Sequence, residues 1–217
     1  MVKAGSTRQR ILGQGLGIAS ERGLAGVSLG GLAGRVGMSK SGLFAHFRSK
    51  EDLQVELLRA AEGALRREVA PAMAEPEGLP RLRALVGRWL GWAARSGLPG
   101  GCPLYGAAFE LDDAEEGPVR AYLTSSKDGW TGMLEGLVGE AVGLGHLRKD
   151  LDVRQFVWRL EGLYLAHHVS QRLMRDPDAD ARARDAFEDL VVSSLPGRAP
   201  DPGGAGRATG PTGEDLR

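Results

Sequence analysis

The chain has 217 residues, of which 42% are hydrophobic and 26% are charged, and its formal net charge at pH 7 is zero. It has neither an apolar leader nor an apolar run of the roughly 18 residues that cross a bilayer, so we expect neither a secretory signal nor a membrane span. The single cysteine, Cys102, excludes an intramolecular disulfide and fits a reducing compartment, so we expect a cytoplasmic protein.

The charges are unevenly distributed along the chain. The first 50 residues carry eight lysines and arginines against one acidic residue, Glu21, a net charge of +7, and the remainder carries −7. Such an asymmetry indicates that the basic part binds a polyanion such as a nucleic acid. A chance clustering of basic side chains is the alternative on charge alone.

Apolar side chains recur at helical spacing throughout, and no segment shows the period-two alternation of a half-buried strand. The pattern predicts an all-α protein of about nine helices. They are expected over residues 7–22, 28–37, 39–46, from 50 to a stop at the proline at 71, 81–96, 103–111, 118–142, 153–174 and 179–195. A linker is expected at 71–80. The segment 196–217 is rich in proline, glycine and charge, which predicts a disordered tail.

Residues 28–47 read as a helix-turn-helix. Two short helices are expected there, joined at Gly37, whose missing side chain permits a tight turn, and Ser28 can cap the first of them. Apolar side chains give the two helices a shared inward face, contributed by Leu29, Leu32, Ala33, Val36, Met38, Leu43 and Phe47. The outward side of the second helix suits insertion into the major groove of DNA, since it carries the small or hydrogen-bonding residues Ser39, Lys40, Ser41, Gly42 and His46.

Three short motifs lie in and after this segment. The chain reads Val36-Gly37-Met38-Ser39, then Phe44-Ala45-His46-Phe47, then Ser49-Lys50-Glu51. Over residues 7–53 it therefore resembles the TetR family of transcriptional regulators, whose pattern has these residue types in this order. Where that family usually has a tyrosine whose hydroxyl commonly meets a phosphate, this chain has Phe44.

The resemblance implies roles for individual positions. The base-facing role falls to Ser39, Lys40, Ser41 and Gly42, with Lys40 the expected donor to guanine. The phosphate-contacting role falls to Ser28, Phe44, His46 and Lys50, and rests mainly on the other three because Phe44 lacks a hydroxyl. By residue type, Phe44 and Phe47 are both expected to be core. A merely solvated Lys40 and a merely helix-capping Ser28 are the alternatives.

The resemblance also implies the architecture of the whole chain. A three-helix DNA-binding domain (1–53) is expected to join, through a long helix, a helical domain (54–195) that binds a small-molecule effector and forms a homodimer. The protein is then a repressor that leaves its double-stranded DNA operator when the effector binds, without catalytic residues or a cofactor. The predicted dimer contact uses helices 153–174 and 179–195, through Phe156, Leu160, Leu163, Ala166, Phe187, Leu190 and Val191.

Aromatic and flexible side chains of the second domain are candidates for an apolar effector pocket. We expect it among Trp89, Trp92, Cys102, Tyr105, Phe109, Trp130, Met133, Trp158 and Tyr164. Ordinary core packing is the alternative for most of them. Cys102 precedes a predicted helix start, where a lowered thiol pKa would make it a redox sensor, against the alternative of a buried, inert cysteine.

Two other classes of function compete with a regulator. An enzyme would use Tyr105, the acidic run 112–116, His167 and His168, but that run beside Gly117-Pro118 is typical of a solvated loop. The adjacent histidines point about 100° apart on a helix and cannot alone share a metal ion, so no metal site is expected. A nonspecific architectural DNA-binding protein would differ from a regulator in that its binding to a given site would not survive an excess of random competitor DNA.

Overall fold

The computed structural model describes residues 7–197, and within them the chain forms ten α-helices and no strand. They are α1 (Thr7–Arg22), α2 (Leu29–Val36), α3 (Lys40–Phe44), α4 (Lys50–Val69), α5 (Leu79–Trp89), α6 (Trp92–Arg95), α7 (Pro103–Glu110), α8 (Pro118–Gly143), α9 (Val153–Val169) and α10 (Ala179–Val192). No helix of this described part is long and apolar enough to cross a membrane. The predicted tail lies outside the described residues from position 198 onward.

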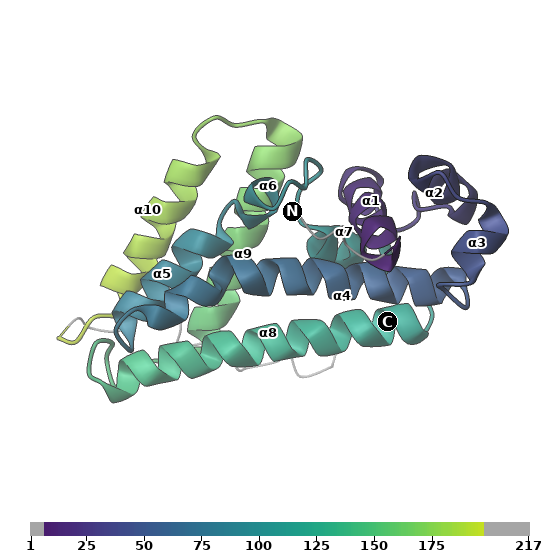
Figure 1. Cartoon of the computed structure of the whole chain (residues 1–217). Coiled ribbons are helices and arrows are strands. Elements are labelled where there is room, and N and C mark those ends of the chain that lie inside the picture. The colour runs from purple at the N-terminus through teal and green to yellow at the C-terminus, as the bar shows by residue number, and fades with distance from the viewer. Residues whose placement is uncertain (1–6, 198–217) are drawn as a thin grey trace, which may run out of the picture.

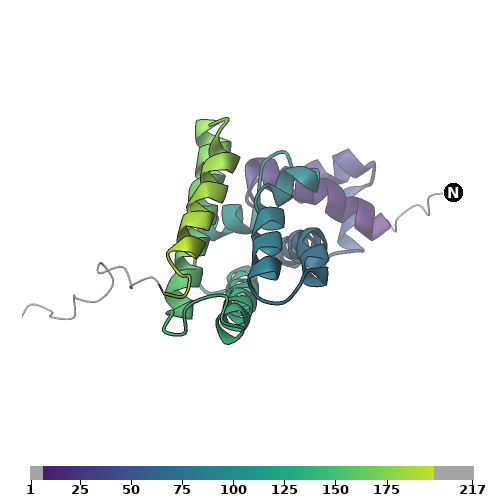
Figure 2. The same cartoon turned by 90° about the vertical axis from the view of Figure 1, so that its left-hand side faces the viewer.

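Helix α4 connects the two ends of the molecule. Figure 1 shows α1, α2 and α3 gathered at one end of α4, while α5, α9 and α10 lie toward the other end and α8 runs alongside it. In Figure 2, α9 and α10 lie side by side along one outer edge, opposite the first three helices. The all-α fold predicted from the helical periodicity is therefore confirmed.

The contact between α1 and α4 explains a glycine inside a helix. A side chain at Gly15 would begin 2.8 Å from a methyl carbon of Leu57 and 3.4 Å from one of Leu32. Glycine lowers helix propensity by about 1 kcal/mol relative to alanine, but here it lets two helices approach closely. Leu32 and Leu57 are fully buried at this crossing, so the glycine belongs to the packing of the first domain onto α4.

Several predicted boundaries need correction. Helix α4 ends at Val69, close to the stop predicted at Pro71, but the predicted linker begins with a 3-10 turn (Ala70–Ala74), in whose first positions a proline nitrogen does not have to donate a hydrogen bond. The predicted linker therefore shrinks to the few residues before Leu79. The helix expected at 81–96 is divided at Gly91, whose φ of +71° cannot continue a right-handed helix, and this division raises the number of helices from nine to ten. The predicted helix 153–174 ends in a π-helical turn (Ser170–Met174).

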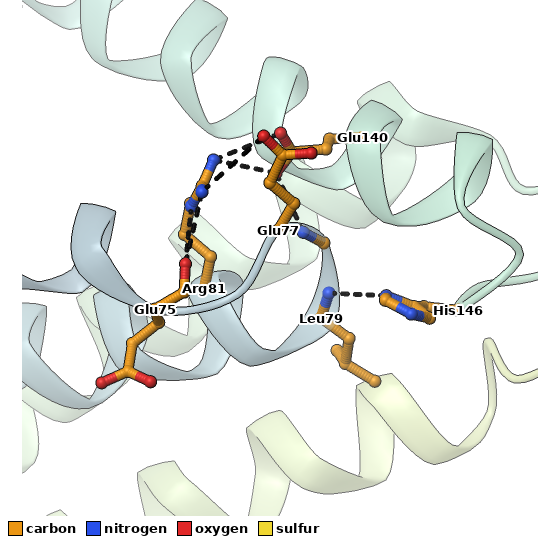
Figure 3. Close-up of polar contacts among 7 residues, drawn as sticks. Glu75, Glu77, Leu79, Arg81, Glu140 and His146 are labelled. Carbon is orange, nitrogen blue, oxygen red and sulfur yellow. Dashed lines mark hydrogen bonds and ion pairs between the residues drawn. The ribbon is translucent and has the colours of Figure 1, made fainter.

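The start of α5 is held by groups from the end of α8 and from the turn after it (Figure 3). Helix α5 has no side-chain cap of its own; instead Gly78 N donates to Glu140 Oε2 at 2.9 Å, and Leu79 N donates to His146 Nδ1 at 3.2 Å. Arg81 also donates to both oxygens of Glu140. Two backbone donors at the start of α5 are thus satisfied by side chains 62 and 67 residues away in the sequence, which fixes α5 against α8.

Candidate DNA-binding surface and ligand cavity

Helices α2 and α3 form the predicted helix-turn-helix. Ser28 Oγ accepts a hydrogen bond from Gly31 N at 3.1 Å, and Ser39 Oγ accepts one from Gly42 N at 3.0 Å, so a serine caps each helix as its residue type favours. Gly37 lies between them with a φ of +69°, in the left-handed region. The N–H of Met38 then reaches back to the carbonyl of Ala33 at 3.0 Å, which closes the end of α2.

The inward face of this unit is largely the predicted one. Five of its side chains are buried, namely Leu32, Ala33, Val36, Leu43 and Phe47, while Leu29 and Met38 are half-buried against the same core. The expectation that Phe44 belongs to the core is wrong, because 44% of it is exposed. On a helix, Phe44 lies on the same side as Lys40, four residues earlier, whereas Phe47 turns inward.

The residues expected to meet DNA lie at the surface. Ser39, Lys40 and Ser41 are exposed on the first turn of α3, Gly42 is half-buried beside them, and Ser39 and Ser41 share a hydrogen bond of 3.1 Å. Ser28, Phe44 and Lys50 are exposed and His46 is half-buried, at or near the ends of α2, α3 and α4. These positions leave their side chains accessible to a ligand, and the individual roles remain predictions.

Not every basic residue of the first 50 is equally available to DNA. Arg8 forms an ion pair with Glu56 of α4, and its guanidinium lies 5.4 Å from the centre of the Phe47 ring. Arg35 and Arg48 are exposed, and Arg48 precedes the capped N-terminus of α4, where Ser49 Oγ accepts from Asp52 N at 3.0 Å. Arg48 adds a cation next to Lys50 that the sequence motifs did not single out.

A cavity of about 350 Å³ lies between α4, α5, α7 and α8. This volume is within the range of sites for small molecules. Its walls are mostly apolar and are formed by Glu62, Leu65, Arg66, Trp89, Cys102, Leu104, Tyr105, Ala108, Leu111, Asp112, Arg120, Leu123, Thr124, Ser126, Lys127, Gly129, Trp130 and Met133.

The nine predicted pocket residues divide into three groups. The cavity is lined by Trp89, Cys102, Tyr105, Trp130 and Met133. Two others lie behind this wall in the core: the Trp92 indole N–H donates to the Tyr164 hydroxyl at 2.8 Å, and the Tyr164 ring stacks on Trp89 at 4.2 Å. The remaining two, Phe109 and Trp158, are 54% and 70% exposed and do not line the cavity, because each points outward from its helix.

Polar residues of the cavity were missed from the sequence. Glu62 accepts hydrogen bonds from Tyr122 at 2.6 Å and Ser126 at 3.0 Å, and from Arg66 at 2.7 Å. Burial raises the pKa of Glu62, but the hydrogen bonds from Tyr122, Arg66 and Ser126 outweigh it and hold the pKa below its usual value. In the sequence, Glu62 and Arg66 are four residues apart, a spacing typical of an exposed ion pair on a helix. Their place in the cavity depends on α8, which packs beside them and supplies Tyr122 and Ser126, and the sequence does not show this contact.

Cys102 does not have the lowered pKa expected at a helix N-terminus. Burial raises the pKa of the thiol, and this effect outweighs the backbone N–H groups of Tyr105 and Leu104, which favour the thiolate. Its burial and raised pKa favour the alternative of a buried, inert cysteine over a redox sensor. Within residues 7–197 there is also no group of three or more metal-ligating side chains that could hold an ion.

Helix α7 lines the cavity with one face and contacts the turn after α1 with the other. Leu104, Tyr105 and Ala108 line the cavity, whereas Glu110 accepts hydrogen bonds of 2.8 Å from the backbone N–H groups of both Leu24 and Ala25, in the turn after α1. The two faces follow from helical spacing, since positions 104, 105 and 108 share one side and position 110 lies on another.

The loop before α7 also contacts α1. Gly100 N donates to Ser20 Oγ at 2.7 Å, and a side chain at Gly100 would begin 1.7 Å from the backbone oxygen of Ser20. The loop and α7 therefore hold the end of α1 at two points. The sequence shows the residues involved but does not reveal that they contact each other.

Two family models match the chain. The model described as bacterial regulatory proteins, tetR family, matches residues 11–57, and the tetracyclin repressor-like C-terminal domain matches residues 78–187. No curated protein sequence matches significantly.

Solved structures share the fold at low sequence identity. A TetR-family transcriptional regulator from Cytophaga hutchinsonii has a TM-score of 0.76 at 20% identity, over 90% of this chain and 98% of its own. One from Chloroflexus aurantiacus has a TM-score of 0.71 at 24% identity, over 89% and 96%. A structure described as a transcriptional regulator from Saccharomonospora viridis, in complex with choline, has a TM-score of 0.72 at 21% identity, over 87% and 97%. The chain is thus a member of the TetR family, a DNA-binding transcriptional regulator rather than an enzyme.

Proposed function

We propose that the protein is a homodimeric repressor that leaves its operator when a small molecule enters the cavity between α4, α5, α7 and α8. This proposal rests on one observation about α7: it lines that cavity and also binds the turn after α1 through Glu110. An effector acts in this way only if it binds the DNA-bound and released conformations with different affinity.

The first experiment measures binding to DNA upstream of the protein's own gene and of a divergently transcribed neighbour. A specific regulator retains its site against random competitor DNA by a factor of about 10³ or more. Equal binding to every sequence would instead support an architectural DNA-binding protein.

The proposed base-reading role of Lys40 predicts a difference between two lysines. Lys40→Ala is expected to weaken binding to the operator by about 1–3 kcal/mol while changing random-DNA binding little, because a lysine donor to guanine reads sequence. Lys50→Ala is expected to weaken both alike and to reduce the salt dependence by about one phosphate contact. Fluorescence anisotropy with operator and scrambled duplexes measures both, and equal losses on the two DNAs for Lys40→Ala would exclude base reading by that residue.

The proposed dimer contact uses the outward side of α9 and the turn after it. Most residues first assigned to this contact are unavailable, since Phe156, Leu160, Phe187, Leu190 and Val191 are buried within the subunit, where α9 and α10 pack on each other and on the core. Large apolar side chains do remain exposed on that edge, at Trp158, Val169, Leu173 and Met174. Such a patch is typical of a protein interface, and pairing also lets two recognition helices reach half-sites about one DNA turn apart.

The proposed coupling through α7 predicts the effect of removing the Glu110 carboxylate. Glu110→Ala is expected to lower the free energy of unfolding by about 1–2 kcal/mol and to speed hydrogen exchange at the amides of Leu24 and Ala25, because both then lack an acceptor. Hydrogen exchange followed by NMR measures this at each amide. Glu115→Ala, in the exposed loop after α7, is the control, and unchanged exchange in Glu110→Ala would show that α7 does not hold the turn.

A further inference from the structure

Two polar atoms in the wall of the cavity have no partner. Trp130 Nε1 and the Tyr105 hydroxyl oxygen are buried, and neither has a hydrogen bond to any residue in the range 7–197. Both residues line the cavity and belong to one aromatic cluster, since the Trp130 ring lies 5.1 Å from that of Trp89 and the Tyr105 ring 4.9 Å from that of Tyr164. Because buried polar groups in proteins are nearly always paired, two such groups in one cavity wall indicate a ligand atom that completes them.

The chemistry of the two groups limits what that atom can be. An indole N–H is only a donor, so its partner is an acceptor. Burial, and next the nearby Glu161, raise the pKa of the Tyr105 hydroxyl well above its ordinary value, so that it stays protonated and also donates. A carbonyl, ether or hydroxyl oxygen of a ligand is therefore the complementary group for both.

Four of the five charged residues that line the cavity are already in ion pairs. Arg66 binds Glu62 at 2.7 Å, Arg120 lies 3.4 Å from Glu116, and Lys127 forms an ion pair with Glu161. Away from Asp112, a charged ligand would have to break one of these pairs or remain uncompensated in an apolar environment, and either costs free energy. The remaining charged wall residue, Asp112, is exposed and accepts a hydrogen bond from the neighbouring backbone N–H of Asp113.

We propose that the cavity binds an uncharged, largely apolar molecule whose oxygen acceptor pairs with Trp130 and Tyr105. This inference rests on the proposed function in one respect, since it names the chemical class of the effector. The mostly apolar walls provide the affinity for such a molecule, and the two donors provide its orientation.

Four naphthalene compounds of similar size test the class of ligand on the full-length protein without DNA. They are 2-acetylnaphthalene, which is neutral and carries an acceptor; 2-isopropenylnaphthalene, which has the same shape without the oxygen; 2-naphthoate; and 2-naphthyltrimethylammonium. Isothermal titration calorimetry is expected to show that the ketone binds about tenfold more tightly than each of the other three. The hydrocarbon cannot accept a hydrogen bond from the unpaired donors, and each of the two ions would bring an unpaired charge into the cavity. Failure of the ketone to bind, or tighter binding of either ion, would overturn the proposal.

Three variants test the two donors. Tyr105→Phe and Trp130→Phe are each expected to reduce the preference for the ketone over 2-isopropenylnaphthalene by about three- to tenfold, because each removes one donor and keeps an aromatic ring. Tyr122→Phe is the matched control: its hydroxyl binds Glu62 and the residue does not line the cavity, so the preference should not change. Equal losses for both ligands in Tyr105→Phe and Trp130→Phe would mean that these residues only pack against the ligand.

The same compounds separate this inference from the proposed function. If the ketone binds as expected but leaves operator affinity unchanged, the inference about the class of ligand is supported, and the proposal that this class of molecule releases the protein from DNA is contradicted. If DNA is released only by one of the two ions, the protein responds to a small molecule but the inference about its chemistry is wrong.

Discussion

Gly100→Ala is expected to lower the free energy of unfolding by about 3 kcal/mol, one of the two largest effects expected here. The new methyl group would begin 1.7 Å from the Ser20 carbonyl oxygen and 2.3 Å from the backbone nitrogen of Glu21, neither of which can turn away as a flexible side chain would. The loop must then move off α1, and the hydrogen bond from Gly100 N to Ser20 Oγ is lost with it. Thermal unfolding should show a decrease in Tm of roughly 6–12 °C for a chain of this size.

Gly106→Ala is the matched control for that substitution. Gly106 lies in α7, a few residues further along, and a side chain there would meet nothing within 4 Å. Because alanine favours a helix over glycine, this variant should be unchanged or more stable by up to about 1 kcal/mol. A Gly100→Ala protein as stable as Gly106→Ala would show that the loop does not rest on α1 in solution.

Trp158→Glu is expected to separate the proposed dimer and, with it, to abolish specific DNA binding at nanomolar protein concentration. Trp158 is 70% exposed on α9, and buried tryptophans in interfaces commonly contribute 2 kcal/mol or more. A carboxylate at the centre of an apolar contact adds the cost of burying a charge. Analytical ultracentrifugation should show a dimer dissociation constant raised by at least about 30-fold, and anisotropy should show a comparable loss of operator affinity.

Met73→Glu is the control for the dimer prediction. Met73 is also a large exposed apolar residue, at 43%, but it lies in the 3-10 turn after α4. The same charge there should leave both the dimer and DNA binding unchanged. A Trp158→Glu protein that remains dimeric would show that the dimer contact does not use this side of α9.

The candidate DNA-binding surface was largely predictable because its signals are local. Ser28, Gly37 and Ser39 specify two helix starts and one turn within a dozen residues, and the apolar spacing specifies which face is buried. Phe44 is the exception. Its residue type predicts burial, yet α3 is only five residues long, and the core beside it is filled by Leu43 of α3 and by Phe47 from the segment after it, so Phe44 remains exposed.

The sequence by itself determined the helical class, the ends of the first three helices, the basic first domain and the family. Apolar periodicity, helix caps, charge and short motifs indicate these features, and each is a property of a continuous segment, so no contact with a distant residue is needed to predict them. Only the tertiary structure decided which aromatic residues line the cavity, which charges are neutralised there, and that Glu110 and Gly100 hold the end of α1. The hydrogen bonds of Glu62 with Tyr122, of Gly100 with Ser20 and of Glu110 with Leu24 join residues 60 to 86 positions apart. A short helix with apolar residues on several sides does not reveal which neighbour each side will contact.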